Sequence, residues 1–141
     1  MKNIFLLTVI AVCISFVGTA QKRYTCIGIF RYEQTYNNKY MLVKAVNGAE
    51  ITFDFDLKHK KIRQYGLGDA EGPRIYNIFK TENTSAGTRY WVRYPTSNEN
   101  DEYLMGDTDY FMIKGGNVEY YADGYICIEF KIRRTTSIPA N

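Results

Sequence analysis

Large apolar residues occupy every second position of a segment near the C-terminus of this chain: Ile126, Ile128, Phe130 and Ile132. The positions between them carry Tyr125, Cys127, Glu129 and Lys131. A period of two places alternate side chains on opposite faces of a β-strand. The segment 125–132 therefore predicts a strand with one face in a core and a wetter face that carries Cys127.

Similar β-prone segments recur from residue 24 onward and are separated by turn signals. Gly28 predicts a bulge or a bend in the first of them. Asn47-Gly48 predicts a type I′ hairpin turn, because both residues tolerate a positive φ. The predicted strands are 24–32, 40–46, 50–56, 75–81, 88–94, 103–114 (one long strand or two short ones), 117–121 and 125–132.

The strand that follows Asn47-Gly48 alternates apolar and polar residues without a break. Its apolar residues are expected to face the core. Its acids, Asp54 and Asp56, are expected to face water, where outward charges keep a strand soluble.

Two segments are less regular. From Leu57 to Tyr65, apolar residues at i, i+4 spacing fit one or two turns of helix, while the composition also fits a charged strand. Both alternatives stay open. The tail 135–141 is expected to be frayed, as chain ends commonly are.

The predicted fold class is all-β. About eight to ten short strands with regular turn signals, and at most one short helix, are typical of a small antiparallel β-barrel or sandwich. The first and last strands carry the cysteines Cys26 and Cys127. This placement favours closure of the hairpins into a barrel, since closure removes exposed sheet edges.

Residues 1–20 have the pattern of a secretory signal peptide. Lys2 is positive, the apolar run 4–17 is too short to span a bilayer, and Gly18-Thr-Ala20 supplies small residues before a cut. We therefore expect a secreted or periplasmic protein whose residues 21–141 form a single domain. A retained N-terminal anchor is the alternative. No second apolar stretch follows, so no stable membrane insertion is expected after cleavage.

Cleavage would remove Cys13 and leave the pair Cys26 and Cys127. An even number of cysteines in an exported chain predicts a disulfide. Closing a loop of about 100 residues would contribute about 4–5 kcal/mol to stability. Two buried free thiols are the alternative.

The charge balance does not indicate nucleic acid as a partner. Removal of Lys2 reduces the 18 basic residues to 17 against 15 acids, which gives a net charge of +2.

The sequence carries no motif of a known catalytic or cofactor site. Its one histidine, His59, lies in Lys58-His-Lys-Lys61 and is expected in a solvated turn. One histidine and a disulfide cannot supply a zinc site, and no phosphate-binding or dinucleotide motif is present. We expect no enzyme, no metal and no cofactor. The pairs Asp54/Asp56 and Asp107/Asp109 keep open a calcium site or the acid–base couple of a hydrolase.

Aromatic residues are the compositional anomaly, with 13 tyrosines and one tryptophan. In the strand 88–94, alternation places Arg89, Trp91 and Arg93 on one face, and Tyr90, Val92 and Tyr94 on the other. A tryptophan between two arginines is a platform for a sugar ring, an anion or a carboxylate. Tyr120-Tyr121 and Tyr125 would add a second wall. The alternative is that Trp91 is buried in the core and the arginines extend past it.

Two family resemblances accompany these patterns. The overall plan resembles the calycin group, the lipocalins and their relatives, although their Gly-x-Trp motif is replaced here by Gly28-Ile-Phe30. Tyr24-Thr-Cys26 and Ser85-Ala-Gly-Thr-Arg-Tyr90 are similar to motifs of the small periplasmic inhibitors of C-type lysozyme, with the second motif one residue short. Both resemblances imply a compact barrel that binds a partner.

The function expected from the sequence is therefore a secreted or periplasmic binding protein without catalytic activity. Its small-molecule or saccharide ligand would be held by an aromatic-rich face or cavity. The alternative is a protein-directed inhibitor or surface interaction module that acts through loops such as 81–88 and 95–102.

Overall fold

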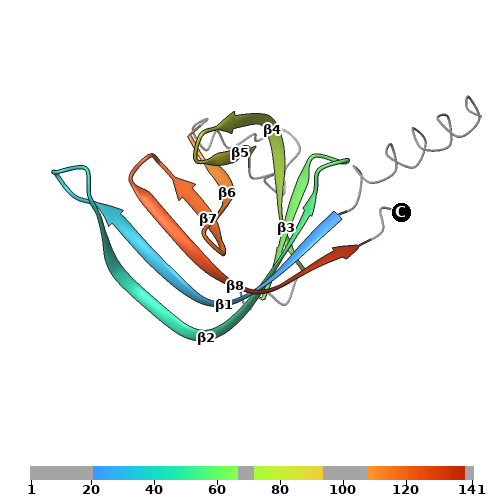
Figure 1. Ribbon diagram of the computed structural model, residues 1–141, viewed down its shortest axis with the longest axis horizontal. Helices are drawn as coiled ribbons and strands as arrows, with labels where there is room; N and C mark the ends of the chain where they lie inside the picture. The colour runs from blue at the N-terminus through green and yellow to red at the C-terminus, as the bar shows by residue number, and fades with distance from the viewer. Residues whose placement is uncertain (1–20, 67–71, 94–107, 139–141) are drawn as a thin grey trace, which may run out of the picture.

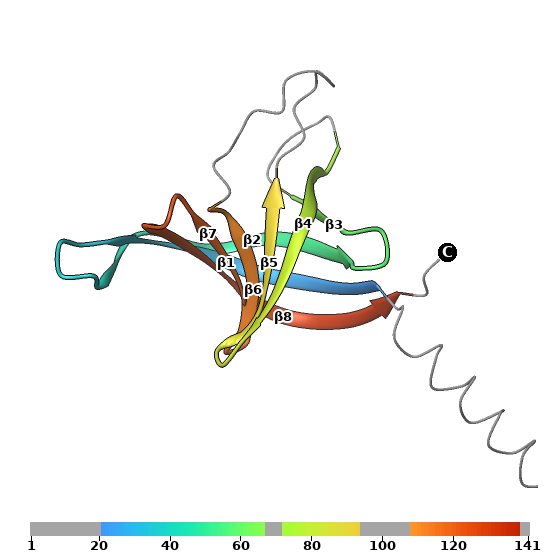
Figure 2. The same ribbon diagram turned by 90° about the horizontal axis from the view of Figure 1, so that it is seen from above.

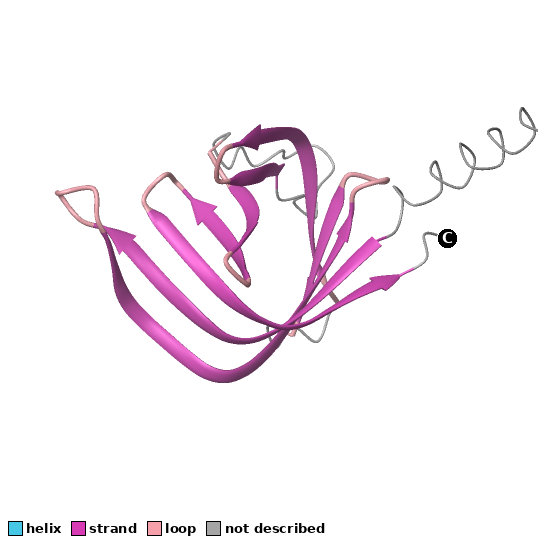
Figure 3. Cartoon of the chain, viewed as in Figure 1, coloured by secondary structure: helices cyan, strands magenta, loops and turns pink. Residues whose placement is uncertain are grey.

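The computed structural model describes residues 21–66, 72–93 and 108–138, and all regular secondary structure in these residues is β-strand (Figure 3). The predicted signal peptide lies outside the described residues. The strands are β1 (Gln21–Gln34), β2 (Tyr40–Asp56), β3 (Lys61–Tyr65), β4 (Arg74–Thr84), β5 (Gly87–Arg93), β6 (Tyr110–Lys114), β7 (Asn117–Ala122) and β8 (Ile126–Ile138).

Each strand pairs antiparallel with the next one, and β8 returns to pair with β1, which closes the sheet into a barrel (Figure 1). The predicted all-β class and the closure of the first strand on the last are confirmed. Residues 57–60 form a turn and Lys61–Tyr65 is a strand, so the charged-strand alternative for this segment is correct. The tail is more ordered than expected, because β8 continues to Ile138, which pairs with Gln21.

The three longest strands, β2, β1 and β8, have 17, 14 and 13 residues and bend strongly (Figures 1 and 2). β1 stays paired with β8 as far as Glu33, and the tip of the β1–β2 hairpin extends past the other strands to the turn around Asn38, whose φ is 57° (Figure 2).

The hairpin predicted at Asn47-Gly48 is wrong, because β2 runs through this position without turning. Gly48 uses its positive φ of 78° in a bulge instead. The pairing of β2 with β1 passes from Ile27↔Glu50 directly to Ile29↔Val46, and Gly28, with φ 97°, lies at the same irregularity. The predicted bulge at Gly28 is thus confirmed, and a glycine on each strand bends the pair together.

The core is a cluster of aromatic and β-branched residues inside the barrel. The Phe53 ring contacts those of Phe130 and Phe111 edge to face, with centroid separations of 4.8 Å and 5.7 Å. Such contacts combine a large buried apolar area with a favourable ring geometry. The most deeply buried apolar residues are Phe53, Phe111, Ile51, Ile62, Val92, Val118 and Cys26.

The predicted disulfide is not formed. Cys26 pairs in register with Ile132, whereas Cys127 pairs with Tyr32, so the two cysteines lie six residues apart along the β1–β8 seam. Six residues of strand span about 20 Å, and a disulfide requires Cα atoms within about 7 Å. Both cysteines are buried free thiols. The predicted exposure of Cys127 is also wrong, since its side of β8 is covered as well.

Candidate functional site

A cavity of about 210 Å³ lies inside the barrel. The residues that line it come from six of the strands, and the aromatic ones dominate the wall. They are Ile29 of β1, Gln64 of β3, Arg74 and Tyr76 of β4, Phe111 of β6, Tyr120 of β7, and Ile128 and Phe130 of β8.

The tyrosine hydroxyls of this wall bond to the protein itself. The Tyr76 hydroxyl donates to Gln64 Oε1 at 3.1 Å, and the Tyr120 hydroxyl donates to Asp109 Oδ2 at 2.6 Å. Asp109 is only 2% exposed and also accepts the backbone N–H of Asp123 at 3.1 Å. Burial, followed by the bond to Asp109, raises the pKa of Tyr120, so this hydroxyl stays neutral. The wall therefore offers rings and methyl groups rather than unsatisfied hydroxyls.

Positive charge gathers beside the cavity. Among the described residues that line the cavity, Arg74 carries the charged side chain. Arg31 pairs in register with Ile128, which lines the cavity, and with Lys44 of β2. Paired residues project from the same face of a sheet, so Arg31 and Lys44 extend the cavity-lining face toward the β1–β2 hairpin. Glu33 forms an ion pair with Arg31 at 2.8 Å and offsets part of this charge.

A second aromatic arrangement crosses the outer face of the barrel. Register places Trp91 beside Tyr110 and Tyr110 beside Tyr121, on three consecutive strands. We call these three residues the outer aromatic row. The Trp91 and Tyr110 centroids are 4.8 Å apart, and the rings of Tyr110 and Tyr121 stack at 4.6 Å with an interplanar angle of 16°. The Lys80 ammonium lies 5.5 Å from the Trp91 ring centroid, next to the end of the row.

The rings of this row face one another rather than the solvent. A saccharide stacks on an open ring face, and here the faces of Tyr110 are already used by its neighbours. The indole N–H of Trp91 also donates to Glu82 at 3.1 Å. The arrangement is consequently better suited to stabilising the outer face than to presenting a flat platform.

The structure brings only some of the predicted binding residues together. Trp91 and Tyr121 belong to the outer aromatic row, and the Arg89 guanidinium lies 5.0 Å from the Tyr110 ring centroid. Arg93 stands apart, 4.3 Å from the ring centroid of Phe79. Tyr125 lies in the turn before β8, half-exposed and without a ring contact to the row among the described residues.

The predicted alternation in this strand is confirmed where it is described. Val92 is buried in the core and Tyr90 packs against it, while Trp91 is partly buried on the outer face. Tyr94 and the loop 95–102 lie outside the described residues. The other predicted interaction loop, 81–88, is a tight hairpin between β4 and β5.

Sequence reasoning missed Tyr110 and most of the cavity wall. Tyr110 falls within the predicted segment 103–114, but nothing in the sequence reveals that it stands between Trp91 and Tyr121. That position depends on the register of β5, β6 and β7.

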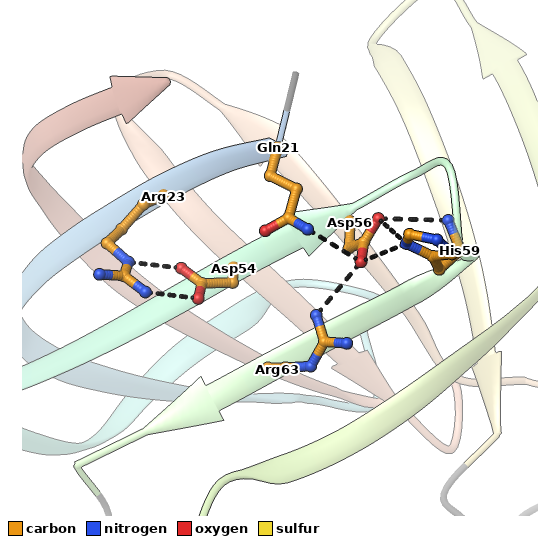
Figure 4. A network of polar contacts seen from close by, with 6 residues as sticks. All are labelled: Gln21, Arg23, Asp54, Asp56, His59 and Arg63. Carbon is orange, nitrogen blue, oxygen red and sulfur yellow. Dashed lines mark hydrogen bonds and ion pairs between the residues drawn. The ribbon is translucent and has the colours of Figure 1, made fainter. Parts of the chain in front are cut away.

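The acids predicted to face water form a buried polar network near the start of β1 (Figure 4). Asp54 accepts two bonds from the Arg23 guanidinium, at 2.6 Å and 2.7 Å. Asp56 is 1% exposed and accepts bonds from His59 Nδ1 at 2.8 Å, Gln21 Nε2 at 3.1 Å and Arg63 Nη1 at 3.3 Å. The solvated placement predicted for these acids is therefore wrong, because partners from β1 and β3 cover them. His59, predicted to be solvated, is half-exposed.

The electrostatics of this network suit a structural role. Burial works to raise the pKa of Asp56, but the bonds from His59 and Arg63 outweigh it and lower the pKa. Asp107, one of the second predicted acid pair, lies outside the described residues. Within the described ranges no group of three or more His, Cys, Asp or Glu residues is arranged to hold a metal.

No known protein-family model matches this sequence, and no curated protein is significantly similar to it. Across the described part of the chain, no helix is both long enough and apolar enough to cross a membrane.

Proposed function

We propose that this protein is a secreted or periplasmic binding protein without catalytic activity, and that it holds a small apolar or aromatic anion in the barrel cavity. The proposal is carried by one observation, the aromatic-lined cavity with Arg74 in its wall. Concave, mostly apolar pockets with a few placed polar groups are the usual form of small-molecule sites.

The size and chemistry of the cavity restrict the ligand. Pockets for drug-sized molecules occupy about 300–1,000 Å³, and this one, at about 210 Å³, fits a single ring or a short branched chain. A saccharide would need several hydrogen-bonding groups in the wall. Tyr76, Gln64 and Tyr120 already use theirs within the protein, which favours an apolar body for the ligand.

The charge beside the cavity favours an anionic end on the ligand. Arg74 lies in the wall, and Arg31 and Lys44 continue the same face toward the hairpin. Guanidinium groups bind carboxylates through paired, charge-assisted hydrogen bonds. A ring or short chain that carries one carboxylate matches both the wall and the charge.

Benzoate and its neutral analogue benzyl alcohol provide the test. We expect benzoate to bind more tightly, to perturb the NMR signals of Phe111 and Tyr120, and to lose affinity as salt is added. Ile128→Phe, which fills the cavity, should abolish binding of both compounds. Arg74→Gln should remove the preference for benzoate.

Trp91→Phe is the matched control, because it alters an aromatic ring on the outer face. It should leave benzoate binding unchanged. Perturbations centred on Trp91 and Tyr110, or benzoate binding that survives Ile128→Phe, would contradict the cavity as the binding site.

A further inference from the structure

The end of the β1–β2 hairpin exposes an unbroken run of residues. Every residue from 36 to 48 is exposed, and we call this segment the hairpin tip. Its turn lies at the far left of Figures 1 and 2, beyond the other strands. Within the described chain, the segment 40–51 has β1 on one side and no strand on the other, since the pairing with β3 begins at Thr52.

The hairpin tip is apolar for an exposed segment. Met41 and Leu42, which are 60% and 52% exposed, pair with consecutive residues of β1 and therefore lie on opposite faces. An exposed apolar surface of this kind marks a site of interaction with a protein or a membrane. The large apolar residues of the tip are Tyr36, Tyr40, Met41, Leu42, Val43 and Val46.

The hairpin tip also carries positive charge. Lys39 and Lys44 are exposed, and neither forms an ion pair within the described residues. The tip contains no aspartate or glutamate. Of the nearest acids, Glu33 is paired with Arg31 at 2.8 Å, and Glu50 lies beyond the bulge in β2. Apolar side chains and uncompensated lysines therefore occur together.

The shape of the tip restricts what can cover it. The pairing of β1 with β2 shifts register twice, between Ile27 and Ile29 and between Arg31 and Tyr32. Lys44 lies in the middle of the exposed edge. Bulges and edge lysines are features by which proteins discourage the addition of another strand. A protein that docks flat on one face would leave the apolar side chains of the other face in water.

We propose that the hairpin tip binds the surface of an anionic phospholipid bilayer, with its end at the boundary between headgroups and acyl chains. A membrane surface surrounds a projecting tip and so covers both faces. Tyrosine rings favour this boundary, and lysines extend their ammonium groups to anionic headgroups. Water reaches this depth, so the unpaired backbone groups of β2 keep hydrogen-bond partners, which the hydrocarbon would not supply. The association is therefore peripheral and reversible.

Co-sedimentation with vesicles tests the proposal. The protein used is the chain from Gln21 onward, which contains every described strand and lacks the apolar run 4–17. We expect binding to vesicles of phosphatidylcholine and phosphatidylglycerol, and binding at least about tenfold weaker to phosphatidylcholine alone. Added salt should weaken the binding. Lys39→Gln/Lys44→Gln should lower the affinity for the anionic vesicles by about tenfold and reduce its dependence on salt.

A second pair of substitutions tests the apolar contribution. Met41→Ser/Leu42→Ser removes an apolar side chain from each face and should weaken binding to the anionic vesicles by about tenfold or more. Leu57→Ser/Lys58→Gln is the matched control, because both side chains are exposed in the turn after β2. It should leave binding unchanged. Circular dichroism of each variant shows whether the barrel is retained.

Tyr36→Trp in a Trp91→Phe background reports on insertion, since Trp91 is the only tryptophan. Its emission should shift to shorter wavelength on the anionic vesicles. Binding without this shift is adsorption by charge alone and overturns the proposal. A control variant that binds as weakly as the tip variants overturns it as well.

Absence of binding at about 1 mM anionic lipid also overturns the proposal. If the protein then forms a dimer that Met41→Ser/Leu42→Ser dissociates, the tip binds a second copy instead. Benzoate binding is measured without vesicles, so none of these results bears on the cavity.

Discussion

Asp56 is the centre of a buried hydrogen-bond network near the start of β1. It is 1% exposed and accepts hydrogen bonds from His59, Gln21 and Arg63. Asp56→Asn leaves these donors facing an amide, so we expect a loss of about 2–3 kcal/mol in the free energy of unfolding. Urea denaturation at neutral pH measures the difference. Asp54→Asn should cost less, about 1 kcal/mol, because the side chain of its partner Arg23 is 42% exposed and water screens the pair.

The same network predicts how stability depends on pH. The pKa of Asp56 is lowered in the folded protein, so its stabilising contribution is fully present above the unfolded pKa of about 3.9. It is lost as the pH falls through the folded pKa. The difference in unfolding free energy between wild type and Asp56→Asn that is present at about pH 5 should therefore shrink below about pH 4. A difference that persists at pH 2 would contradict this assignment.

The alternation of residues in the sequence predicted on which face of a strand a side chain lies, but not whether that side chain is buried. The alternation in 50–56 correctly placed Phe53 and Phe55 in the core and Asp54 on the opposite face. The alternation did not predict that Asp54 and Asp56 are buried, because the groups that cover these two acids belong to other segments of the chain. Arg23 is about thirty residues away in sequence, and only the register of β1 against β2 brings it to Asp54.

At the level of elements, Gly66 fixes the end of β3 against β2. Its φ is 95°, and a Cβ placed on it would lie 2.6 Å from the backbone oxygen of Glu50. Gly66→Ala should therefore cost about 2–4 kcal/mol, since backbone must move in addition to the unfavourable φ. Gly116→Ala is the matched control, because Gly116 has φ 76° but no described atom within 4 Å of such a Cβ. It should cost only about 1–2 kcal/mol in thermal or urea unfolding.

Equal effects at the two glycines would show that φ strain alone matters and that the close approach of Gly66 to Glu50 does not restrict β3.

The β1–β8 seam holds its two cysteines as unreactive thiols. Burial raises the pKa of Cys26 to about 12 and that of Cys127 to about 11, from 9.0. The thiolate of Cys26 is thus about a thousandfold rarer than that of an ordinary thiol near pH 8. We expect a thiol reagent to leave both unlabelled in the native protein and to label both in denaturant without any reductant. If labelling in denaturant required a reductant, the two cysteines would be joined in a disulfide and the assignment as free thiols would be wrong.

Turn signals in the sequence identified most hairpins of the barrel, and the one failure has a physical cause. Gly115-Gly116 and Asp123-Gly124 turn the chain between the predicted strands 103–114, 117–121 and 125–132, and both use positive φ angles. Asn47-Gly48 has the same local chemistry but lies where β1 also carries a glycine, Gly28. The positive φ there serves a bulge within a long bent pair. Local propensity permits both uses, and the neighbouring strand selects between them.

On the scale of the whole molecule, the sequence predicted closure but not the sites that closure creates. A succession of hairpins with β-prone first and last strands is enough to indicate a barrel. The cavity needs Ile29, Tyr76 and Tyr120 to converge, and the outer aromatic row needs Trp91, Tyr110 and Tyr121 to align. Both depend on register between strands, which a pattern within one strand does not specify.

Closure also places the two ends of the described chain side by side, since Gln21 pairs with Ile138. A circular permutant that joins Ile138 to Gln21 through a short linker, and opens the chain in the turn at Ser85-Ala86, should keep a barrel of similar stability. It should also fold faster. The longest-range seam, β1–β8, becomes a local hairpin, while the shorter β4–β5 pairing becomes the distant one.

Stopped-flow refolding and equilibrium unfolding of both proteins measure these effects. Opening the chain instead between β1 and β2, near Asn38, with the same linker gives a second permutant whose new termini interrupt another long pairing. This permutant should gain less speed. If the two permutants fold at the rate of the natural order, loop closure across the β1–β8 seam is not the slow step, and the barrel nucleates elsewhere in its hairpins.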